Sequence, residues 1–175
     1  MPHPTQFILY IATTLDGYIA SPDGRIDWLT TLDAGSEDVG YEAFYNTIEA
    51  LVMGAATYEQ VLTFGDWPYA HKPSYVMTRR QLSSDRPDVT FVSDVETVLA
   101  EVERQGWQRV WLVGGGQVAA EFMRRGLVHE WIVAIAPIIL GDGISLYQQV
   151  PMQKLQLVNS RHFQSGMVEL HYTMP

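Results

Sequence analysis

The sequence contains no cysteine among its 175 residues. This absence excludes disulfide bonds, thiolate metal ligands and a cysteine nucleophile, and it leaves the cellular compartment open. Basic residues are few: 11 Lys and Arg stand against 20 Asp and Glu, for a formal net charge of −9. A chain this acidic is a poor candidate for binding nucleic acid or an anionic membrane surface. We therefore expect neither as a partner.

Long hydrophobic runs are also missing. The longest, residues 131–140, is far shorter than a membrane span and contains Pro137. The N-terminal MPHPTQF has no basic flank and no apolar core, so it does not resemble a signal peptide. The hydrophobic fraction of 47% and charged fraction of 18% are ordinary for a globular protein. We expect a single domain spanning residues 1–175, soluble and cytoplasmic.

Motifs for metal and nucleophilic chemistry are absent. The sequence has neither an HExxH metal motif nor a GxSxG nucleophile elbow. Its histidines are scattered, with no pair at i and i+4 that could bind a metal from one helix face: His3, His71, His129, His162 and His171. We therefore expect no metal site.

The most informative stretch covers residues 110–126, VWLVGGGQVAAEFMRRG. Its first four residues are a short apolar run, typical of a strand buried on both faces. Three glycines break the run, residues 117–125 resume with helical spacing, and Gly126 stands where a helix C′ glycine is expected. Backbone amides at the start of a helix have no internal partner and favour a phosphate, which glycines allow to come close. The alternative is a tight turn without a ligand, because the triplet is neither GxGxxG nor a Walker loop.

Strand and helix patterns alternate along most of the chain. We predict strands at residues 7–12, 50–53, 74–77, 89–92, 110–113 and 129–139. We predict helices from Ser36 to about residue 48, from Thr57 to about 62, from Ser93 or Asp94 to Gly106, and over 117–125. A hairpin of residues 155–163 and 167–172 follows. This order indicates an α/β fold with a mostly parallel central sheet flanked by helices and an antiparallel C-terminal hairpin.

Ligands of open α/β sheets bind outside the C-terminal ends of the strands. Three such ends carry suggestive residues: 54–57, 78–80 and 114–117. Two offer helix N-termini, and the third offers Arg79 and Arg80, whose guanidinium groups suit a phosphate. The alternative for the two arginines is a solvated charge pair at a strand end.

Carboxylates that could orient or protonate a substrate are Asp16, Asp27 and Asp38. For each, the alternative is a turn or helix-capping role. Asp16 and Asp27 lie in a loop over residues 13–28 that is rich in apolar side chains. Such a loop packs on a ligand or neighbouring subunit, or covers its own core.

Five motifs in this order resemble the dihydrofolate reductase-like superfamily. They are TLDGYIA (14–20), VMGAATYE (52–59), VMTR (76–79), LVGGG (112–116) and ILGDG (139–143). The nearest branch is the reductase domain of the bacterial bifunctional riboflavin-biosynthesis deaminase/reductase, the RibD C-terminal domain. The resemblance covers about residues 7–172.

The resemblance implies an eight- to ten-stranded sheet, NADPH-dependent hydride transfer and a homodimer. It implies that Gly115, Gly116 and Gln117 line the pyrophosphate, that Thr57 lies near the phosphates, and that Thr78 and Arg79 lie near the adenosine 2′-phosphate. It implies that residues 12–19 border the nicotinamide and the substrate. The full set of cofactor-binding candidates is Ala12, Ile19, Gly54, Ala55, Thr57, Thr78, Arg79, Arg80, Val113, Gly114, Gly115, Gly116, Gln117 and Val118. The catalytic candidates are Asp38, which aligns with the substrate carboxylate of the folate enzymes, and Asp16.

Three departures from the family pattern affect these expectations. Ala55 replaces a usual arginine, so one cation for the 2′-phosphate is missing and NADH use becomes possible. Tyr18 replaces a lysine and Gly114 replaces a glutamate, which argues against the ribityl-aminopyrimidine substrate of the riboflavin enzymes.

The sequence thus favours an NAD(P)H-dependent reductase that transfers a hydride to a small conjugated heterocycle, pterin- or pyrimidine-like as in riboflavin or folate metabolism. The alternative is a nucleotide- or flavin-binding module without turnover. A third reading is an unrelated α/β domain that assembles through exposed aromatic side chains.

Overall fold

A computed structural model describes residues 4–32 and 40–175. Its strands are β1 Gln6–Thr14, β2 Tyr18–Ala20, β3 Ala50–Gly54, β4 Ser74–Met77, β5 Val89–Val92, β6 Arg109–Gly114, β7 Val128–Ala136, β8 Ile144–Ser145, β9 Gln156–His162 and β10 Val168–Thr173. Its helices are α1 Asp27–Thr30, α2 Tyr41–Asn46, α3 Ala55–Leu62, α4 Val95–Gln105 and α5 Gly116–Arg124.

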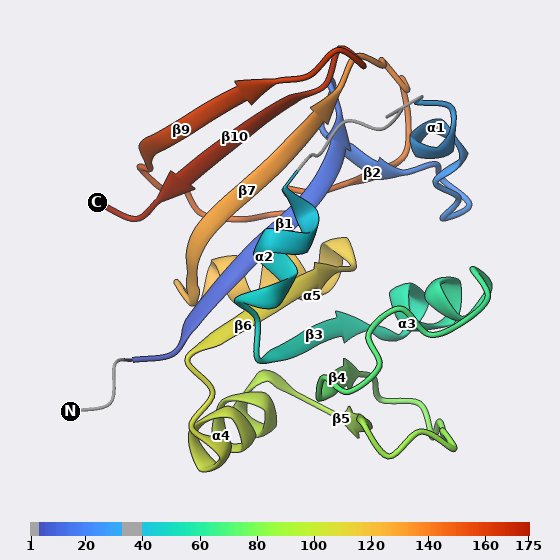
Figure 1. Ribbon diagram of the computed structural model, residues 1–175, viewed down its shortest axis with the longest axis vertical. Helices are drawn as coiled ribbons and strands as arrows, with labels where there is room; N and C mark the ends of the chain where they lie inside the picture. The colour runs from blue at the N-terminus through green and yellow to red at the C-terminus, as the bar shows by residue number, and fades with distance from the viewer. Residues whose placement is uncertain (1–3, 33–39) are drawn as a thin grey trace.

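Eight strands form one sheet in the order β5-β4-β3-β6-β1-β7-β10-β9 (Figure 1). The first six run parallel, whereas β10 is antiparallel to β7 and β9 is antiparallel to β10. The short strands β2 and β8 pair separately. The predicted α/β fold, a mostly parallel sheet finished by an antiparallel hairpin, is confirmed.

The central strands are buried on both faces because helices cover both sides of the sheet. All five residues of β3 are buried. On one face, α4 and α5 pack through Val98 and Phe122 against Leu9 and Leu112. On the other, α2 packs on Trp111 through Phe44 and Tyr45, and Tyr58 of α3 packs on Trp67. In Figure 1, α2 lies across β1 and β6, on the viewer's side of the sheet.

Helix α4 shows how local sequence sets the boundaries of an element. The Asp94 carboxylate accepts the Thr97 N–H at 2.8 Å and caps the first turn. Gly106 ends the helix in the left-handed conformation, with φ 74°. Its apolar stripe of Val95, Val98 and Val102 faces the sheet, so the sequence and the packing agree.

Two predicted elements differ from those observed. The helix containing Phe44 begins at Tyr41 after Gly40, which has φ 78°, and it ends at Asn46. The cap predicted for it, Ser36, lies outside the described residues. The strand predicted over 129–139 ends at Ala136, because Pro137 has no N–H to continue a ladder. That strand lies between β1 and β10, inside the sheet rather than at its edge.

Within the described part of the chain, no helix has the length and apolar character needed to cross a membrane.

Candidate functional site

A long cleft of about 2230 Å³ opens at the C-terminal ends of the parallel strands. It passes over the ends of β4, β3, β6 and β1 and reaches the C-terminal hairpin. Each of the fourteen cofactor-binding candidates lines it: Ala12, Ile19, Gly54, Ala55, Thr57, Thr78, Arg79, Arg80, Val113, Gly114, Gly115, Gly116, Gln117 and Val118. The topology therefore gathers residues in or just after β1, β2, β3, β4 and β6 around one space.

The turn between β6 and α5 lies at the middle of this cleft. Gly115 has φ 90°, a conformation that side chains rarely adopt. A Cβ on Gly115 would stand 3.4 Å from the Thr57 hydroxyl and 3.6 Å from the Gly54 nitrogen. The first backbone bond within the helix is donated by Ala119 to the Gly115 carbonyl at 3.0 Å. The amides of residues 116–118 therefore precede the intrahelical ladder.

A second helix N-terminus lies beside the first. β3 and β6 are neighbours in the sheet, with Met53 opposite Gly114. Helix α3 starts directly after β3, as α5 starts after β6, so both helices begin at the same edge. Their partial positive charges add at this point, which favours an anionic group.

One side of the glycine turn is closed by the segment that follows β7. The Gln148 amide nitrogen and the Ser145 carbonyl oxygen stand where a Cβ on Gly116 would lie. Gln148 is held there because its side chain donates to that same carbonyl at 2.8 Å. Gly116 is thus required by packing on one side, and both Gly115 and Gly116 line the cleft.

The arginines on the cleft differ in whether they already have a partner. Arg25, Arg80, Arg124 and Arg125 each form an ion pair with a carboxylate. For Arg80 the partner is Glu59, at 2.9 Å, and this contact raises the pKa of the guanidinium above its ordinary value. No ion pair or hydrogen bond holds the Arg79 guanidinium within residues 4–32 and 40–175. Arg79 is therefore the arginine of the cleft best able to bind a phosphate.

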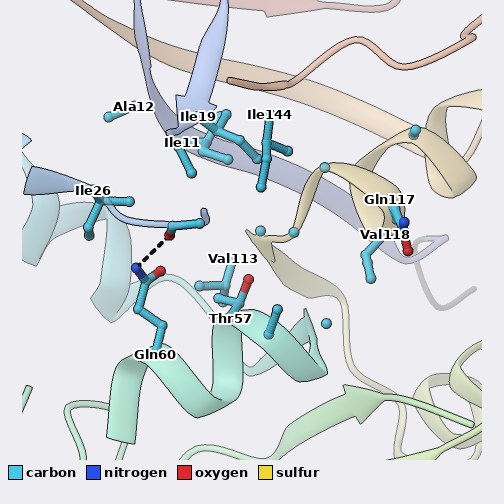
Figure 2. Close-up of a pocket in the computed structure, with 18 of the residues that line it drawn as sticks. Ile11, Ala12, Ile19, Ile26, Thr57, Gln60, Val113, Gln117, Val118 and Ile144 are labelled. Carbon is cyan, nitrogen blue, oxygen red and sulfur yellow. Dashed lines mark hydrogen bonds between the residues drawn. The ribbon is translucent and has the colours of Figure 1, made fainter. Parts of the chain in front are cut away.

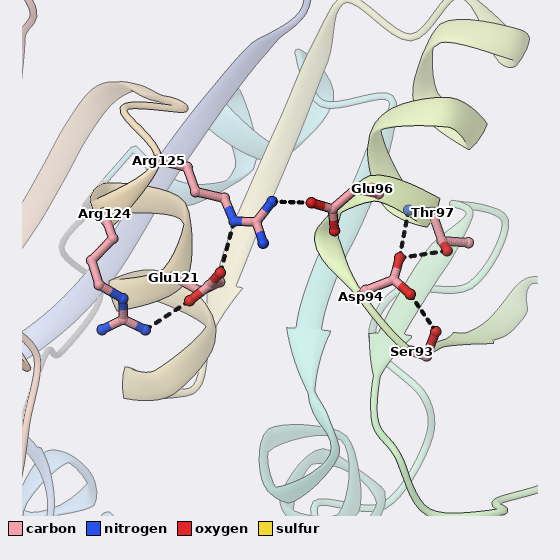
Figure 3. Close-up of polar contacts among 7 residues, drawn as sticks. All are labelled: Ser93, Asp94, Glu96, Thr97, Glu121, Arg124 and Arg125. Atoms are coloured by element: carbon pink, nitrogen blue, oxygen red, sulfur yellow. Dashed lines mark hydrogen bonds and ion pairs between the residues drawn. The ribbon is translucent and has the colours of Figure 1, made fainter.

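A polar network forms the rim beside α4 and α5 (Figure 3). Glu121 accepts from Arg124 at 2.8 Å and from Arg125 at 2.7 Å, and Arg125 also pairs with Glu96 on α4. Hydrogen bonds from Ser93, and then Thr97, lower the pKa of the Asp94 carboxyl to about 2. These carboxylates remain ionised at neutral pH, and they engage both arginines of the rim.

The apolar part of the cleft lies between β1 and α3 (Figure 2). Ile11, Ile19 and Ile144 gather on one side, and Thr57 and Gln60 on α3 lie across from them. Gln60 donates to the Gly24 carbonyl at 3.1 Å. This bond ties the 21–26 loop to α3 and brings Ile26 to the cleft wall.

The loop over residues 13–28 covers part of the core and also lines the cleft. Trp28 is buried, so the loop covers part of its own core. Ile19, Ile26 and Trp28 also line the cleft.

Asp16 lies elsewhere. It is exposed, and it is not among the residues that line the cleft. Its carboxylate accepts from the Thr14 hydroxyl at 2.6 Å and from the amides of Leu140 and Gly141 at 3.1 and 2.8 Å. These bonds, that of Thr14 foremost, lower the pKa of Asp16 to about 2. This geometry joins the end of β1 to the loop after β7 and so supports a structural role for Asp16. The catalytic role expected from the sequence stays a prediction.

The other two carboxylates are not among the described residues that line the cleft, and their catalytic roles stay predictions. Asp38 lies outside the described residues. Asp27 is exposed at the start of α1 and pairs with Arg25 at 3.1 Å.

Several residues that line the cleft were not predicted as site residues from the sequence. Ser93 and Asp94 follow β5, and the strand-end rule that selected residues 78–80 applies equally to them. Phe163, Met167 and Glu169 come from the C-terminal hairpin, where no local motif indicates a ligand. Their place in the cleft depends on strand pairing alone.

Comparisons with known proteins identify the family of this chain. The family model of the RibD C-terminal domain matches residues 5–169. The chain belongs to this family. It is 35% identical over 168 residues to the uncharacterized protein YwjB of Bacillus subtilis, covering 94% of this chain and 95% of YwjB. It is 28% identical to the riboflavin biosynthesis protein RibD of Corynebacterium ammoniagenes, covering 83% of this chain and 46% of RibD.

Solved structures agree on the architecture. A protein from Shewanella sp. PV-4, provisionally assigned to riboflavin biosynthesis, superposes with a TM-score of 0.87 at 28% identity, covering 97% of this chain and 99% of that one. The deaminase/reductase of Thermotoga maritima superposes with a TM-score of 0.72 at 19% identity, covering 98% of this chain and 57% of that one. The second likeness concerns the fold alone. Family membership makes the chain a relative of the riboflavin-pathway reductases.

Proposed function

We propose that this protein is a nicotinamide-dinucleotide-dependent reductase that transfers a hydride to a small conjugated nitrogen heterocycle. The observation that carries the proposal is the open turn at Gly115, flanked by two helix N-termini at the centre of the cleft. Backbone amides and helix dipoles at such a turn suit a diphosphate. Family membership supports a reductase-like role.

The residues present fit a dinucleotide. A Cβ at position 115 would fill the space beside Thr57 and Gly54, which glycine leaves free for phosphate oxygens. In this proposal, the amides of Gly116 and Gln117 and the Thr57 hydroxyl hold the diphosphate. Arg79, beyond β4, holds the 2′-phosphate of NADPH, which we therefore place ahead of NADH as the cofactor.

In this proposal, the remaining residues of the cleft surround the reacting rings. When bound, the reduced nicotinamide supplies the hydride. Ala12 on β1 presents a small side chain to the space beside Ile19. Ile11, Ile19 and Ile144 exclude water from the reacting rings, and the cleft fixes their relative orientation.

Titration of the purified protein with NADPH and with NADH tests the proposal. We expect micromolar binding of NADPH and weaker binding of NADH. A panel of pterins, pyrimidines and quinones then tests turnover through loss of reduced-nicotinamide absorbance. Failure of both cofactors to bind below millimolar contradicts the proposal, and binding without turnover across the panel favours a nucleotide-binding module.

A further inference from the structure

An ion pair between Arg80 and Glu59 lies at the end of the cleft where we place the 2′-phosphate. Both residues line the cleft, as do Thr78 and Arg79 beside them. The Nη2 atom of Arg80 lies 2.9 Å from Oε1 of Glu59. The carboxylate of Glu59 therefore contributes to the charge that a ligand meets at this strand end.

Two neighbouring strands bring the pair together. β3 and β4 run side by side, with Gly54 opposite Met77. Helix α3 starts after β3, carries Glu59 in its second turn and packs beside β4 (Figure 1). Arg80 follows β4, and its backbone N–H donates to the Thr78 hydroxyl at 3.0 Å. This bond fixes the backbone of the turn, so the guanidinium is the part that is free to change partner.

The two adjacent arginines of this turn differ in charge compensation. Among the described residues, Glu59 is the sole partner of the Arg80 guanidinium, and the Arg79 guanidinium has none. Ala55, one helical turn before Glu59, also lines the cleft and brings no charge. Glu59 therefore neutralises one of the two positive charges that this strand end would otherwise offer to an anion.

The contact between Arg80 and Glu59 is one that a phosphate group could replace. The side chains are 57% and 48% exposed, and the contact joins one nitrogen to one oxygen. An exposed pair of this kind adds little net stability, because water solvates both partners when they separate. A phosphate group binds a guanidinium more strongly, through bidentate contacts. The carboxylate would then remain close to the phosphate and repel it.

This arrangement affects the two nicotinamide cofactors unequally. NADPH carries a 2′-phosphate with a charge of about −1.5 to −2 at neutral pH, by analogy with other phosphate monoesters. NADH carries a 2′-hydroxyl at the same place, which a carboxylate accepts without repulsion. A carboxylate that engages an arginine at this point lowers the affinity for NADPH and leaves NADH unopposed.

We propose that Glu59 is a specificity-determining residue that limits the preference of this cleft for NADPH over NADH, because it holds Arg80 away from the 2′-phosphate. The inference rests on the proposed reductase function and concerns the choice of its cofactor. Arg79 supplies the phosphate contact that is always available. The pair of Glu59 and Arg80 sets how large the preference is.

Fluorescence titration with NADPH and with NADH tests the inference in four proteins: wild type, Glu59→Gln, Arg80→Ala and the double variant. We expect Glu59→Gln to bind NADPH about 5-fold more tightly than the wild type, because Arg80 is released to the phosphate. Its affinity for NADH should stay nearly unchanged. In the Arg80→Ala background the same change should alter NADPH affinity about 2-fold or less, since the gain depends on Arg80.

Glu103→Gln is the matched control. It removes an equal charge from an exposed position on α4 that does not line the cleft, and it should leave both affinities unchanged. An equal gain for NADPH in Glu103→Gln would assign the effect to the net charge of the protein and overturn the role of Glu59.

The remaining outcomes separate this inference from the reductase proposal. Binding of neither cofactor by the wild-type protein contradicts the proposed function, and the inference with it. Normal binding by the wild type, with the same ratio of NADPH to NADH affinity in Glu59→Gln, overturns the role of Glu59 alone. A full gain in the double variant overturns the account through Arg80.

Discussion

The two ends of the cleft are built from different parts of the chain. The proposed cofactor end consists of the turns from β3 to α3 and from β6 to α5, which line the cleft with Gly115. The other end consists of side chains, chiefly aromatic rings and Glu169, from strands that are far apart in sequence. A site made of backbone amides depends on a few adjacent residues. A site made of side chains from distant strands depends on strand register, which local sequence does not specify.

Replacing Gly115 with valine should break the cofactor end most severely. The φ of 90° is strained for a β-branched residue, and the side chain would occupy the space beside Thr57. We expect NADPH affinity to fall roughly 100-fold or more, measured by fluorescence titration. Gly126→Val is the matched control, because Gly126 also has a positive φ, of 65°, but does not line the cleft. Equal affinity in the two variants would remove the glycine turn from the site.

Arg79→Ala should change the affinity for NADPH far more than the affinity for NADH. Arg79 has no ion pair within the described residues, whereas Arg80 is engaged by Glu59. We expect Arg79→Ala to weaken NADPH about 10-fold, because a charge-assisted phosphate contact is lost, and to leave NADH nearly unchanged. Arg80→Ala is the matched control and should have the smaller effect on NADPH. Equal losses for NADPH and NADH in Arg79→Ala would show that Arg79 does not contact the 2′-phosphate.

Asp16→Asn should affect stability and not cofactor binding. The pKa of Asp16 in the folded protein, about 2, lies below its ordinary value of 3.8. The stabilisation is therefore complete above pH 3.8 and is lost as the pH falls through about 2. Thermal unfolding should show the wild type more stable than Asp16→Asn at neutral pH, with the difference vanishing between those two values.

The matched control for this change is Asp66→Asn, at an exposed position, which should leave the melting temperature unchanged across the same pH range. A fall in turnover in Asp16→Asn, without any fall in melting temperature, would restore the catalytic role expected from the sequence.

Arg125→Gln should have the smallest effect. Arg125 links α5 to α4 through Glu96, but the pair is partly exposed and screened by solvent (Figure 3). We expect a slight fall in melting temperature that disappears at about 1 M salt, where the Debye length is about 3 Å. Arg104→Gln, which breaks a pair within α4, should shift it less still. A large shift that persists at high salt would mean that the rim network is a main support of the cleft.

Sequence patterns predicted most of the parallel sheet and a set of residues that the structure brings together along one cleft. Apolar runs ended by glycine or a helix cap gave β3, β6 and α4 with nearly their observed boundaries. These elements depend on local preferences, such as the Asp94 cap and the αL conformation of Gly106. The pairing of the hairpin was also foreseen, because Gly166 marks its turn.

The start of α2 and the buried position of Glu169 could not be predicted, and Arg161 contacts both. Gly40 precedes the helix in a left-handed conformation, and the Arg161 guanidinium occupies the place that its Cβ would take. Arg161 in turn holds Glu169. The absence of a side chain at position 40 thus depends on a residue 121 positions away. A single sequence shows no periodicity or motif for such a contact.

The location of the diphosphate tests the central claim most directly. A crystal structure of the wild-type protein with bound NADP⁺ should show diphosphate oxygens within hydrogen-bonding distance of the amides of Gly116 and Gln117, with the Gly115 Cα facing the same group. A diphosphate bound elsewhere in the cleft, with these amides contacting protein atoms instead, would contradict the account.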